Sequence, residues 1–475
     1  MKVAVVGAGI AGLTAAHHLA EAGHDVVVLD AADHAGGKLH AVPFAGVDLE
    51  TAADSFVARR PEALELCGQL GLADELVGPS ETSAYLFTRG ALRRMPTGSV
   101  LGVPTDFGSL RRSGVLSPLG AARAALEPYL PGRPITDDVA VGALIRSRYG
   151  SQVATRLVDP LVGGINAGHV DQLSIDVSAA QLATAARRDR SLTRSLRATT
   201  AAAPTPAPGS APAPVFLTLP GGLGRLIDAL VASVESRGGS VRLATPVRRI
   251  APDDGGYLLD DGSPGGLHAD AAVLAGPAWV SARLLSTLAP TTAAVLAAVE
   301  HASVAMATMA FPDEAVPRAL DASGFVVPRP EGLTMTGCTW ADRKWAHLRR
   351  SGQVLLRVSA GRVDNDDAAL PDDELVRRLR SDLHTTMGIT AEPSELRIHR
   401  WPRSFPQFAP GHLARIARAL DELQADHPRL ALAGAALSGV GVPACIGTGR
   451  AAAERLQLAA GAMTDTNLTG DGSID

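Results

Sequence analysis

Three glycines near the start of the chain have the spacing of a pyrophosphate-binding turn. They belong to the motif Gly7-Ala8-Gly9-Ile10-Ala11-Gly12, which follows the apolar, β-branched run 2–6. In such a motif the first glycine makes the tight turn, the second lets the backbone approach a pyrophosphate, and the third lets helix and strand pack closely. The amino terminus of the following helix faces the phosphates. The spacing therefore predicts that residues 7–12 bind a dinucleotide.

An acidic residue at the end of the next apolar run completes this pattern. Asp30 ends the run 25–30, where its carboxylate can accept hydrogen bonds from ribose hydroxyls. Gly36, Gly37 and Lys38 follow and suit a loop that lies along the cofactor, because a lysine ammonium serves as a point charge for phosphate. A plain NAD dehydrogenase has no need of this extension. We therefore expect non-covalently bound FAD rather than NAD.

The cysteines and histidines show no spacing that indicates catalysis or metal binding. Cys67, Cys338 and Cys445 are odd in number and far apart, which predicts neither a disulfide framework nor a metal site. His169 lies in the glycine-rich segment 159–169, and we interpret it as structural rather than as a base. No side chain is assigned a catalytic role, and the flavin N5 position is expected to carry the chemistry.

Composition and charge are those of a globular chain that works without nucleic acid. The 475 residues are 46% hydrophobic and 20% charged, and the formal net charge is −5. This balance has no basic excess, which argues against nucleic-acid binding. Since an apolar strand begins at Lys2 and no run of 18 apolar residues exists, we expect neither a signal peptide nor a membrane span. A cytoplasmic location is predicted, and peripheral contact with a membrane stays open.

The elements that must position these residues alternate between helices and strands. Helical spacing with a closing glycine predicts a helix from residue 10 to residue 23. Further helices are predicted over 118–126, 139–149, 151–161, 178–196, 372–387 and 449–461, a hairpin over 85–96, and strands over 303–311, 324–327, 333–339, 354–359, 396–401 and 430–434. This order predicts an α/β fold with a discontinuous Rossmann-like FAD-binding domain, a mixed-sheet substrate domain and a helical insert.

Length and changes in composition divide the chain into domains and connecting segments. The FAD-binding domain is expected in three parts, at 1–82, 215–297 and 411–463. The other segments are a helical insert facing substrate or membrane (83–200), a Pro/Ala-rich linker (201–214), a substrate-binding domain (298–410) and a flexible tail (464–475).

By the combination of its motifs, the chain resembles the protoporphyrinogen/coproporphyrinogen oxidase family of flavoproteins. The similar segments are Gly36-Gly37-Lys38, Asp54-Ser55-Phe56, Met95-Pro96 with Val103-Pro104-Thr105, Gly163 to Gly168, Pro220-Gly221-Gly222, Trp401-Pro402, Pro406-Gln407 and Gly439 to Ile446. They span essentially the whole chain. One departure is Ala52-Ala53, which stand where members of that family usually have Gly-Pro.

The resemblance implies an FAD-dependent oxidase of heme biosynthesis that removes six electrons from a porphyrinogen, with O2 as the acceptor and H2O2 as a product. The cofactor contacts that it implies are Gly7, Ala8, Gly9, Ile10, Ala11, Gly12, Asp30, Ala31, Lys38, Asp54, Ser55, Val247, Trp401, Ala435, Val440, Gly441 and Val442. Gly441, Gly447 and Gly449 are expected to let the last loop approach the flavin ring. The amino terminus of the helix that follows would then face the flavin.

The expected substrate is coproporphyrinogen III, with protoporphyrinogen IX as the alternative. The first carries four propionates and the second two, and nearly all positive charge in this chain is arginine, whose guanidinium matches carboxylates bidentately. The candidate propionate clamps are Arg59, Arg60, Arg93 and Arg94, and the candidates for the pocket wall are Gly164 and Asn166. The arginines and the lack of obvious membrane-binding helices favour coproporphyrinogen.

Three other functions are alternatives to this one. A flavin amine oxidase would carry a lysine on the predicted strand at 303–307 and an aromatic cage, whereas this stretch has no lysine and the chain is 4% aromatic. A phytoene-desaturase-like role is similarly disfavoured. A non-catalytic escort of small GTPases shares the fold, but its flavin motifs have decayed, and here both ends retain them. The expected partners are a porphyrinogen, O2 and, from the pathway, a ferrochelatase-type enzyme.

Overall fold

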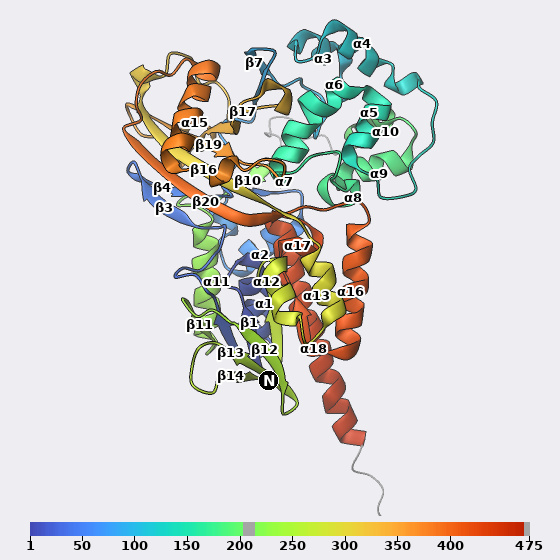
Figure 1. Cartoon of the computed structure of the whole chain (residues 1–475), viewed down its shortest axis with the longest axis vertical. Coiled ribbons are helices and arrows are strands. Elements are labelled where there is room, and N and C mark those ends of the chain that lie inside the picture. Colours follow the sequence, from blue (N-terminus) through green and yellow to red (C-terminus); the bar gives the residue numbers. More distant parts are fainter. Residues whose placement is uncertain (203–213, 470–475) are drawn as a thin grey trace, which may run out of the picture.

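A five-stranded parallel sheet lies at the centre of the lower body in Figure 1. The computed structural model describes residues 1–202 and 214–469, with side chains up to residue 460. The strands of this sheet come from three distant parts of the chain, in the order β11-β2-β1-β15-β21. Their bounds are β1 (Lys2–Val6), β2 (Asp25–Leu29), β11 (Ser240–Arg242), β15 (Ala271–Leu274) and β21 (Leu430–Leu432). The apolar runs form parallel strands because both faces of such a sheet are covered.

Helices cover one face of this sheet, and helices with a small second sheet cover the other. Along β1, Val3 and Val5 point into one core and Ala4 and Val6 into the other, as the twofold alternation of a strand requires. The first core is formed with α1 (Ile10–Glu21), α2 (Pro61–Gln69), α11 (Gly224–Ser236) and α18 (Val442–Thr469). The second is formed with β12 (Arg249–Asp253), β13 (Gly256–Asp260), β14 (Leu267–Ala269), α12 (Ala278–Leu285), α13 (Pro290–Ala297) and α16 (His412–Asp426).

A seven-stranded mixed sheet forms part of the upper body, in the order β20-β16-β19-β18-β17-β6-β7. The bounds are β6 (Tyr85–Thr88), β7 (Ala91–Arg94), β16 (His301–Pro312), β17 (Gly324–Val326), β18 (Met335–Trp340), β19 (Gln353–Ala360) and β20 (Glu395–Pro406). The predicted hairpin near residue 90 joins this sheet, because β6 pairs in parallel with β17. The predicted helix 372–387 is present as α15 (Asp372–Met387) and packs against the sheet.

Helices with their own apolar core form the rest of the upper body (Figure 1). They are α3 (Phe107–Ser113), α4 (Pro118–Ala125), α5 (Val141–Tyr149), α6 (Ser151–Val153), a π-helix (Ala154–Gly163), α7 (Gly164–Asn166), α8 (Ile175–Ser178), α9 (Ala180–Arg188) and α10 (Leu192–Ala201). The π-helix contains Pro160, whose missing N–H cannot continue a regular α-helical ladder. Most of the predicted helix 151–161 therefore forms a π-helix rather than an α-helix.

Three short antiparallel strand pairs lie outside the two large sheets. They are β3 (Ala41–Phe44) with β4 (Val47–Glu50), β5 (Phe56–Val57) with β10 (Phe216–Leu217), and β8 (Ser99–Val100) with β9 (Val103–Pro104). β5 and β10 bring the chain on either side of the helical region together, at the boundary between the upper and lower bodies.

The prediction of one helix over 178–196 is wrong, because the chain breaks between α9 and α10. Ser191 caps α10 by accepting a hydrogen bond from the Arg194 N–H. The buried Glu127 carboxylate also accepts from the Leu192 N–H at 2.8 Å. These acceptors satisfy N–H groups that a continuous helix would have paired internally.

Two predicted segments fall largely outside the described residues. The Pro/Ala linker at 201–214 lies there except at its ends, and so do the last residues of the predicted tail, 470–475. The first part of that tail differs from the prediction, because α18 continues to Thr469.

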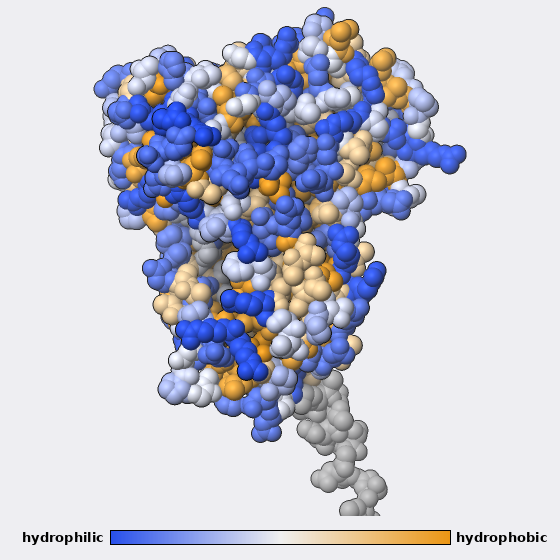
Figure 2. Space-filling model, viewed as in Figure 1, coloured by the Kyte–Doolittle hydropathy of each residue, from blue (hydrophilic) through white to orange (hydrophobic). Residues whose placement is uncertain are grey.

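Hydrophilic side chains cover most of the upper body on the face drawn in Figure 2, and apolar residues appear there in separate patches. Within residues 1–202 and 214–469, no helix is long and apolar enough to span a membrane.

Candidate functional site

The glycine motif forms the turn from β1 into α1, and each glycine has a different surrounding. Gly7 has φ +116°, and a methyl group on it would lie 3.0 Å from the Ala275 carbonyl carbon. A methyl group on Gly12 would overlap the Gly7 carbonyl oxygen, so glycine is needed there for helix and strand to pack. A methyl group on Gly9 meets no atom of the described chain within 4 Å. The space beside Gly9 is therefore open to a ligand.

The first turn of α1 has the electrostatic properties of an anion site. Gly9 is the N-cap, no side chain in the described structure caps the helix, and no acidic residue lies in its first turn. The N–H groups of this turn have no partner within the helix, and the helix dipole is positive at this end. This arrangement fits the pyrophosphate of a dinucleotide.

Asp30 lies directly beside this turn, as the sequence predicted. Its Oδ2 accepts a hydrogen bond from the Ala8 N–H at 2.6 Å, and its Oδ1 accepts from the Ala32 N–H at 2.8 Å. The Gly36 N–H donates to the Ala8 carbonyl at 2.8 Å, so the second glycine loop also lies against the motif. Ala31 belongs to the same bend.

Lys38 connects this loop to the end of β20. Its Nζ donates to the Ser404 carbonyl and lies 5.0 Å from the centre of the Phe405 ring. Burial lowers the pKa of Lys38, and the Cys445 thiol on α18 is close enough to influence it. Segments near residues 38, 404 and 445 therefore meet at one place.

The last glycine segment differs from the prediction in where its helix begins. α18 starts at Val442, directly after Gly441, and seven residues before the predicted start at Gly449. A methyl group on Gly449 would overlap the Ala11 carbonyl oxygen, so this glycine lets α18 pack against α1. The expectation that Gly449 opens a loop toward the flavin is wrong. Val440 and Gly441 remain in the connection between α17 (Ala435–Ser438), which begins at Ala435, and α18.

Val247 and Trp401 approach the same region from two other segments. Val247 is buried with Val6 and Leu29, which end β1 and β2. Just before it, the Thr245 N–H donates to the Asp30 carbonyl at 2.7 Å. The Trp401 indole N–H on β20 donates to the Thr51 carbonyl at 3.2 Å.

Asp54 uses its side chain to join the two bodies rather than to reach a ligand. Its carboxylate pairs with Lys344 at 2.9 Å and Arg357 at 3.2 Å, and Ser55 Oγ donates to it at 2.9 Å. Burial disfavours the carboxylate, but the charges of Lys344 and Arg357 outweigh burial and hold the pKa of Asp54 well below its usual range. The predicted cofactor contacts of Asp54 and Ser55 stay predictions.

Glu50 is a buried carboxyl beside this cluster that sequence reasoning missed. Its Oε1 accepts from the Leu223 N–H, while its Oε2 is buried with no hydrogen-bond partner in the described structure. Burial raises the pKa of Glu50 to about 7. No local pattern in the sequence marks Glu50, because the turn that buries it, near Gly222 and Leu223, lies about 170 residues later in the chain.

The four candidate arginine clamps lie in two separate places. Arg59 and Arg60 stand between β5 and α2, where Arg59 donates to Gln181 of α9 at 3.3 Å and Arg60 pairs with Glu62 at 3.0 Å. Arg93 and Arg94 lie on β7, the edge strand of the seven-stranded sheet. Arg94 pairs with Asp321 there, and Arg93 donates to the Thr88 carbonyl at 3.3 Å. Only the first pair lies next to α2, whose apolar side packs with the cofactor sheet.

The segment proposed as a pocket wall presents backbone and one apolar side chain outward. Asn166 is buried, and its amide donates to the Val162 carbonyl at 2.8 Å, so its side chain holds the segment together. A methyl group on Gly164 meets no described atom within 4 Å, and the neighbouring Ile165 is 58% exposed. Sequence reasoning missed Arg329, which donates to the Gly168 carbonyl at 2.6 Å and fixes the end of this segment.

His169 has a local structural explanation. Its Nδ1 accepts a hydrogen bond from the Asp171 N–H at 3.2 Å, within the turn that follows the wall segment.

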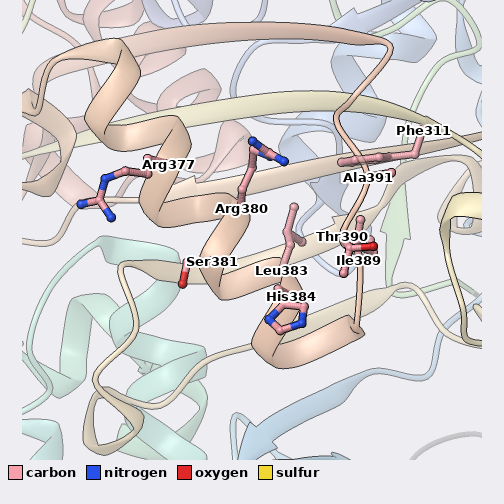
Figure 3. A pocket seen from close by; sticks show the side chains of 9 residues that line it. All are labelled: Phe311, Arg377, Arg380, Ser381, Leu383, His384, Ile389, Thr390 and Ala391. Atoms are coloured by element: carbon pink, nitrogen blue, oxygen red, sulfur yellow. The ribbon is translucent and has the colours of Figure 1, made fainter.

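A separate cavity of about 330 Å³ lies along α15 and contains none of the predicted site residues (Figure 3). Its two arginines already have partners, since Arg377 pairs with Glu374 at 2.7 Å and Arg380 with Glu392 at 2.6 Å. Its lining residues are Phe311, Arg377, Arg380, Ser381, Leu383, His384, Ile389, Thr390 and Ala391.

Comparisons with known proteins show that the chain is similar to flavin-dependent oxidoreductases over nearly its whole length. The family profile described as "Flavin containing amine oxidoreductase" matches residues 10–457. A coproporphyrinogen III oxidase from Propionibacterium freudenreichii is 36% identical over 97% of this chain and 91% of the relative. One from Bacillus subtilis is 30% identical over 95% of this chain and 96% of the relative. The crystal structure of an Exiguobacterium sp. 255-15 protein assigned as a protoporphyrinogen oxidase has a TM-score of 0.85 and 30% identity, covering 96% of this chain and 99% of that one.

Proposed function

The chain belongs to the family of flavin-containing amine oxidoreductases, and we propose that it is a coproporphyrinogen III oxidase that forms coproporphyrin III with O2 as the acceptor. Membership of the family confirms the predicted α/β flavoprotein fold, the flavin cofactor and the oxidoreductase class. The observation that carries the substrate assignment is the near full-length identity with relatives named for this reaction.

The residues of the dinucleotide site fit FAD. The N–H groups at the start of α1 would hold the pyrophosphate beside Gly9, and Asp30 would bind the adenosine ribose. The amino terminus of α18 would present the positive end of its dipole to the flavin ring. When bound, FAD supplies the hydride acceptor and returns the electrons to O2, which yields H2O2.

The chain itself must hold a large apolar macrocycle with charged propionates. The outward Gly164 and Ile165 are suited to contact an apolar ring, and of the four candidate arginines Arg59 and Arg60 lie next to the cofactor body. Such a combination of apolar wall and a few placed charges is typical of ligand pockets. We assign Arg59 and Arg60 to propionate binding, while Arg93 and Arg94 are weaker candidates because they lie on the edge strand β7, away from α2 and the cofactor sheet.

Protoporphyrinogen IX is the second candidate substrate, because the Exiguobacterium structure is assigned to that activity. Aerobic turnover by the purified, FAD-loaded protein distinguishes the two, with porphyrin fluorescence as the readout. We expect faster fluorescence growth with coproporphyrinogen III, and three H2O2 for each porphyrin formed. Faster growth with protoporphyrinogen IX would reverse the substrate assignment. No growth above the non-enzymatic rate with either would exclude a porphyrinogen oxidase.

We also propose a cytoplasmic location and, as a partner, a ferrochelatase-type enzyme that would consume the porphyrin product. For peripheral contact with a membrane or with that partner, the surface to examine is α4 together with the turn that follows it. Leu119, Leu126 and Tyr129 are exposed there by 84%, 53% and 82%. Clusters of exposed large apolar residues commonly mark interaction sites.

A further inference from the structure

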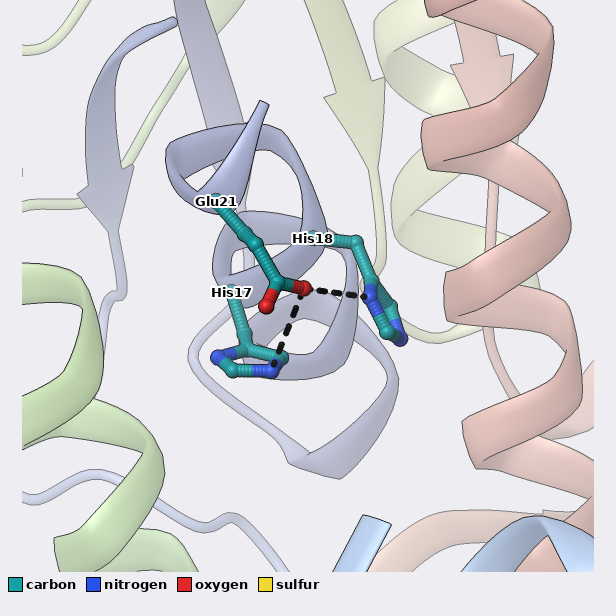
Figure 4. Close-up of side chains that lie close together, drawn as sticks. All are labelled: His17, His18 and Glu21. Atoms are coloured by element: carbon teal, nitrogen blue, oxygen red, sulfur yellow. Dashed lines mark ion pairs between the residues drawn. The ribbon is translucent and has the colours of Figure 1, made fainter. Parts of the chain in front are cut away.

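The last turns of α1 carry three side chains of metal-binding type that the flavin site does not use. They are His17, His18 and Glu21, and Figure 4 shows both imidazole rings beside the Glu21 carboxylate. Glu21 Oε2 lies 4.0 Å from His17 Nε2 and 3.6 Å from His18 Nδ1. Helical spacing of three and four residues places both histidines next to the glutamate.

Two nitrogen atoms in this cluster are buried without a partner. His17 Nε2 and His18 Nε2 have no hydrogen-bond partner among the described residues, and the His17 side chain is only 2% exposed. Buried polar atoms in native proteins almost always have a partner, so such atoms point to a missing water or ion. His17 Nε2 is the nitrogen that faces Glu21 (Figure 4).

A neighbouring helix fixes the orientation of the buried histidine. His17 Nδ1 lies 2.7 Å from Ser233 Oγ on α11, and Arg237 donates to the same oxygen at 2.6 Å. When the second nitrogen of an imidazole is hydrogen-bonded in this way, the first is held ready as a metal ligand. His17 Nε2 is therefore oriented as a candidate ligand by the hydrogen bond that Nδ1 of the same ring makes with Ser233.

The charges that face the cluster come from α11 and α18. Burial lowers the pKa of His17 and of His18, and Arg237 faces His17 while Arg450 faces His18. The positive charges oppose a cation, but Arg450 is paired with Glu65 at 2.7 Å, and Glu454 adds negative charge near His18.

We propose that His17, His18 and Glu21 bind one divalent transition-metal ion, with Zn²⁺ as the reference ion and water completing the coordination. Two imidazoles and a carboxylate are a donor set that suits zinc. The ligand atoms already lie within 4.8 Å of one another. Bonds of about 2.0–2.2 Å in a tetrahedral site need ligand atoms about 3.3–3.5 Å apart, so small side-chain rotations complete the site. Glu21 is 53% exposed and provides the entry from solvent.

Binding here would act on the helix that carries the dinucleotide motif at its other end. The ligands belong to the last turns of α1, and Ser233 attaches the site to α11. An ion that binds only the folded site raises the stability of the whole domain. The proposal is independent of the substrate that the enzyme oxidises.

Calorimetric titration of Zn²⁺ into the flavin-loaded full chain, without a histidine tag, tests the site. We expect one saturable equivalent and a higher thermal midpoint in the presence of Zn²⁺. H18Q and E21Q should weaken binding by at least about tenfold, and S233A, which removes the outer support, by about tenfold. The matched control is H34Q, which changes a histidine beside Asp33, outside this cluster, and should bind as the unchanged chain does.

E21Q alters an exposed side chain, so its effect can be measured even if a change at the buried His17 prevents folding. Absence of saturable binding by the unchanged chain would overturn the proposal. So would equal affinity and an equal rise in thermal midpoint in H18Q, E21Q and H34Q.

Discussion

At the scale of single residues, Arg60 is the arginine best placed to distinguish the two porphyrinogens. Among the described residues its guanidinium pairs with Glu62, in the first turn of the helix α2 that Arg60 directly precedes. Its side chain is 54% exposed, and it lies at the edge of the cofactor body. An exposed pair of this kind contributes little to stability, so the guanidinium is available to a propionate at small cost.

Arg60→Ala is expected to raise KM for coproporphyrinogen III by about tenfold, which corresponds to one charged hydrogen bond of about 1.4 kcal/mol. The rise for protoporphyrinogen IX should be smaller, because fewer propionates need a partner. Steady-state kinetics with both substrates measures the difference. Arg94→Ala is the matched control, since Arg94 is an equally exposed, paired arginine that lies on the edge strand β7, away from α2. Equal effects of Arg60→Ala on both substrates would remove Arg60 as the discriminating clamp.

Glu50 makes the stability of the protein depend on pH. Its pKa is raised from 4.5 to about 7, so between these values the folded protein binds a proton that the unfolded chain releases. Where the folded state binds more protons, the free energy of unfolding falls as pH rises. This decrease in the free energy of unfolding is therefore complete above about pH 7 and absent below about pH 4.5.

Glu50→Gln should remove this dependence, because the amide is neutral at every pH and still offers an oxygen to the Leu223 N–H. Relative to the unchanged chain, the variant is expected to gain up to about 3 kcal/mol between pH 5 and pH 8. Urea unfolding at the two pH values measures the gain. Glu235→Gln, at an exposed position of α11, is the control and should show no such gain. An unchanged pH dependence in Glu50→Gln would contradict the buried, protonated state.

At the scale of elements, the turn from β1 into α1 contains one glycine that packing requires and another that ligand binding requires. Gly12 is enforced by the chain, since a methyl group would overlap the Gly7 carbonyl. Gly9 has ordinary backbone angles, φ −75° and ψ 174°, and free space around it. Nothing in the described chain explains glycine at position 9, whereas a pyrophosphate lying against the backbone does.

Gly9→Ala is therefore expected to lower the free energy of unfolding of the apoprotein by no more than about 1 kcal/mol, the cost of alanine at an N-cap position, and to weaken FAD binding by at least about tenfold. Gly12→Ala should instead destabilise the fold itself. Flavin fluorescence titration and thermal unfolding of the apoprotein measure the two effects separately. Wild-type FAD affinity in Gly9→Ala would show that the pyrophosphate does not approach this glycine.

At the scale of the whole molecule, the ion cluster at Asp54 holds the two bodies together. The carboxylate belongs to the first segment of the chain. Its two partners lie about three hundred residues later, where Lys344 comes shortly after β18 and Arg357 lies on β19 of the seven-stranded sheet. All three side chains are largely buried, and removing one partner from a buried pair leaves a charge uncompensated.

Lys344→Met is expected to lower the free energy of unfolding by about 2 kcal/mol, below the usual range for a buried pair because Arg357 still faces Asp54. Adding Asp54→Asn to that variant should restore part of the loss. Urea unfolding of both single variants and the double variant gives the coupling energy. Strict additivity would show that Lys344 and Asp54 do not interact.

The sequence alone determined the cofactor end of this protein. The motif Gly7 to Gly12, the acid Asp30 and the apolar strands are local signals, and the structure places them together as predicted. The helix 372–387 was also predicted to its ends, because proline, acidic first-turn residues and a closing glycine mark it locally. Local chemistry suffices where neighbouring residues decide the structure.

Tertiary structure decided which side chains are free and which are already paired. The Asp54 carboxylate is paired with Lys344 and Arg357, about three hundred residues later in the chain, and Gly449 packs against α1 within a helix. The helix predicted at 178–196 is broken by acceptors that include a carboxylate more than sixty residues earlier in the chain. These outcomes depend on contacts between segments far apart in sequence, which no local spacing encodes.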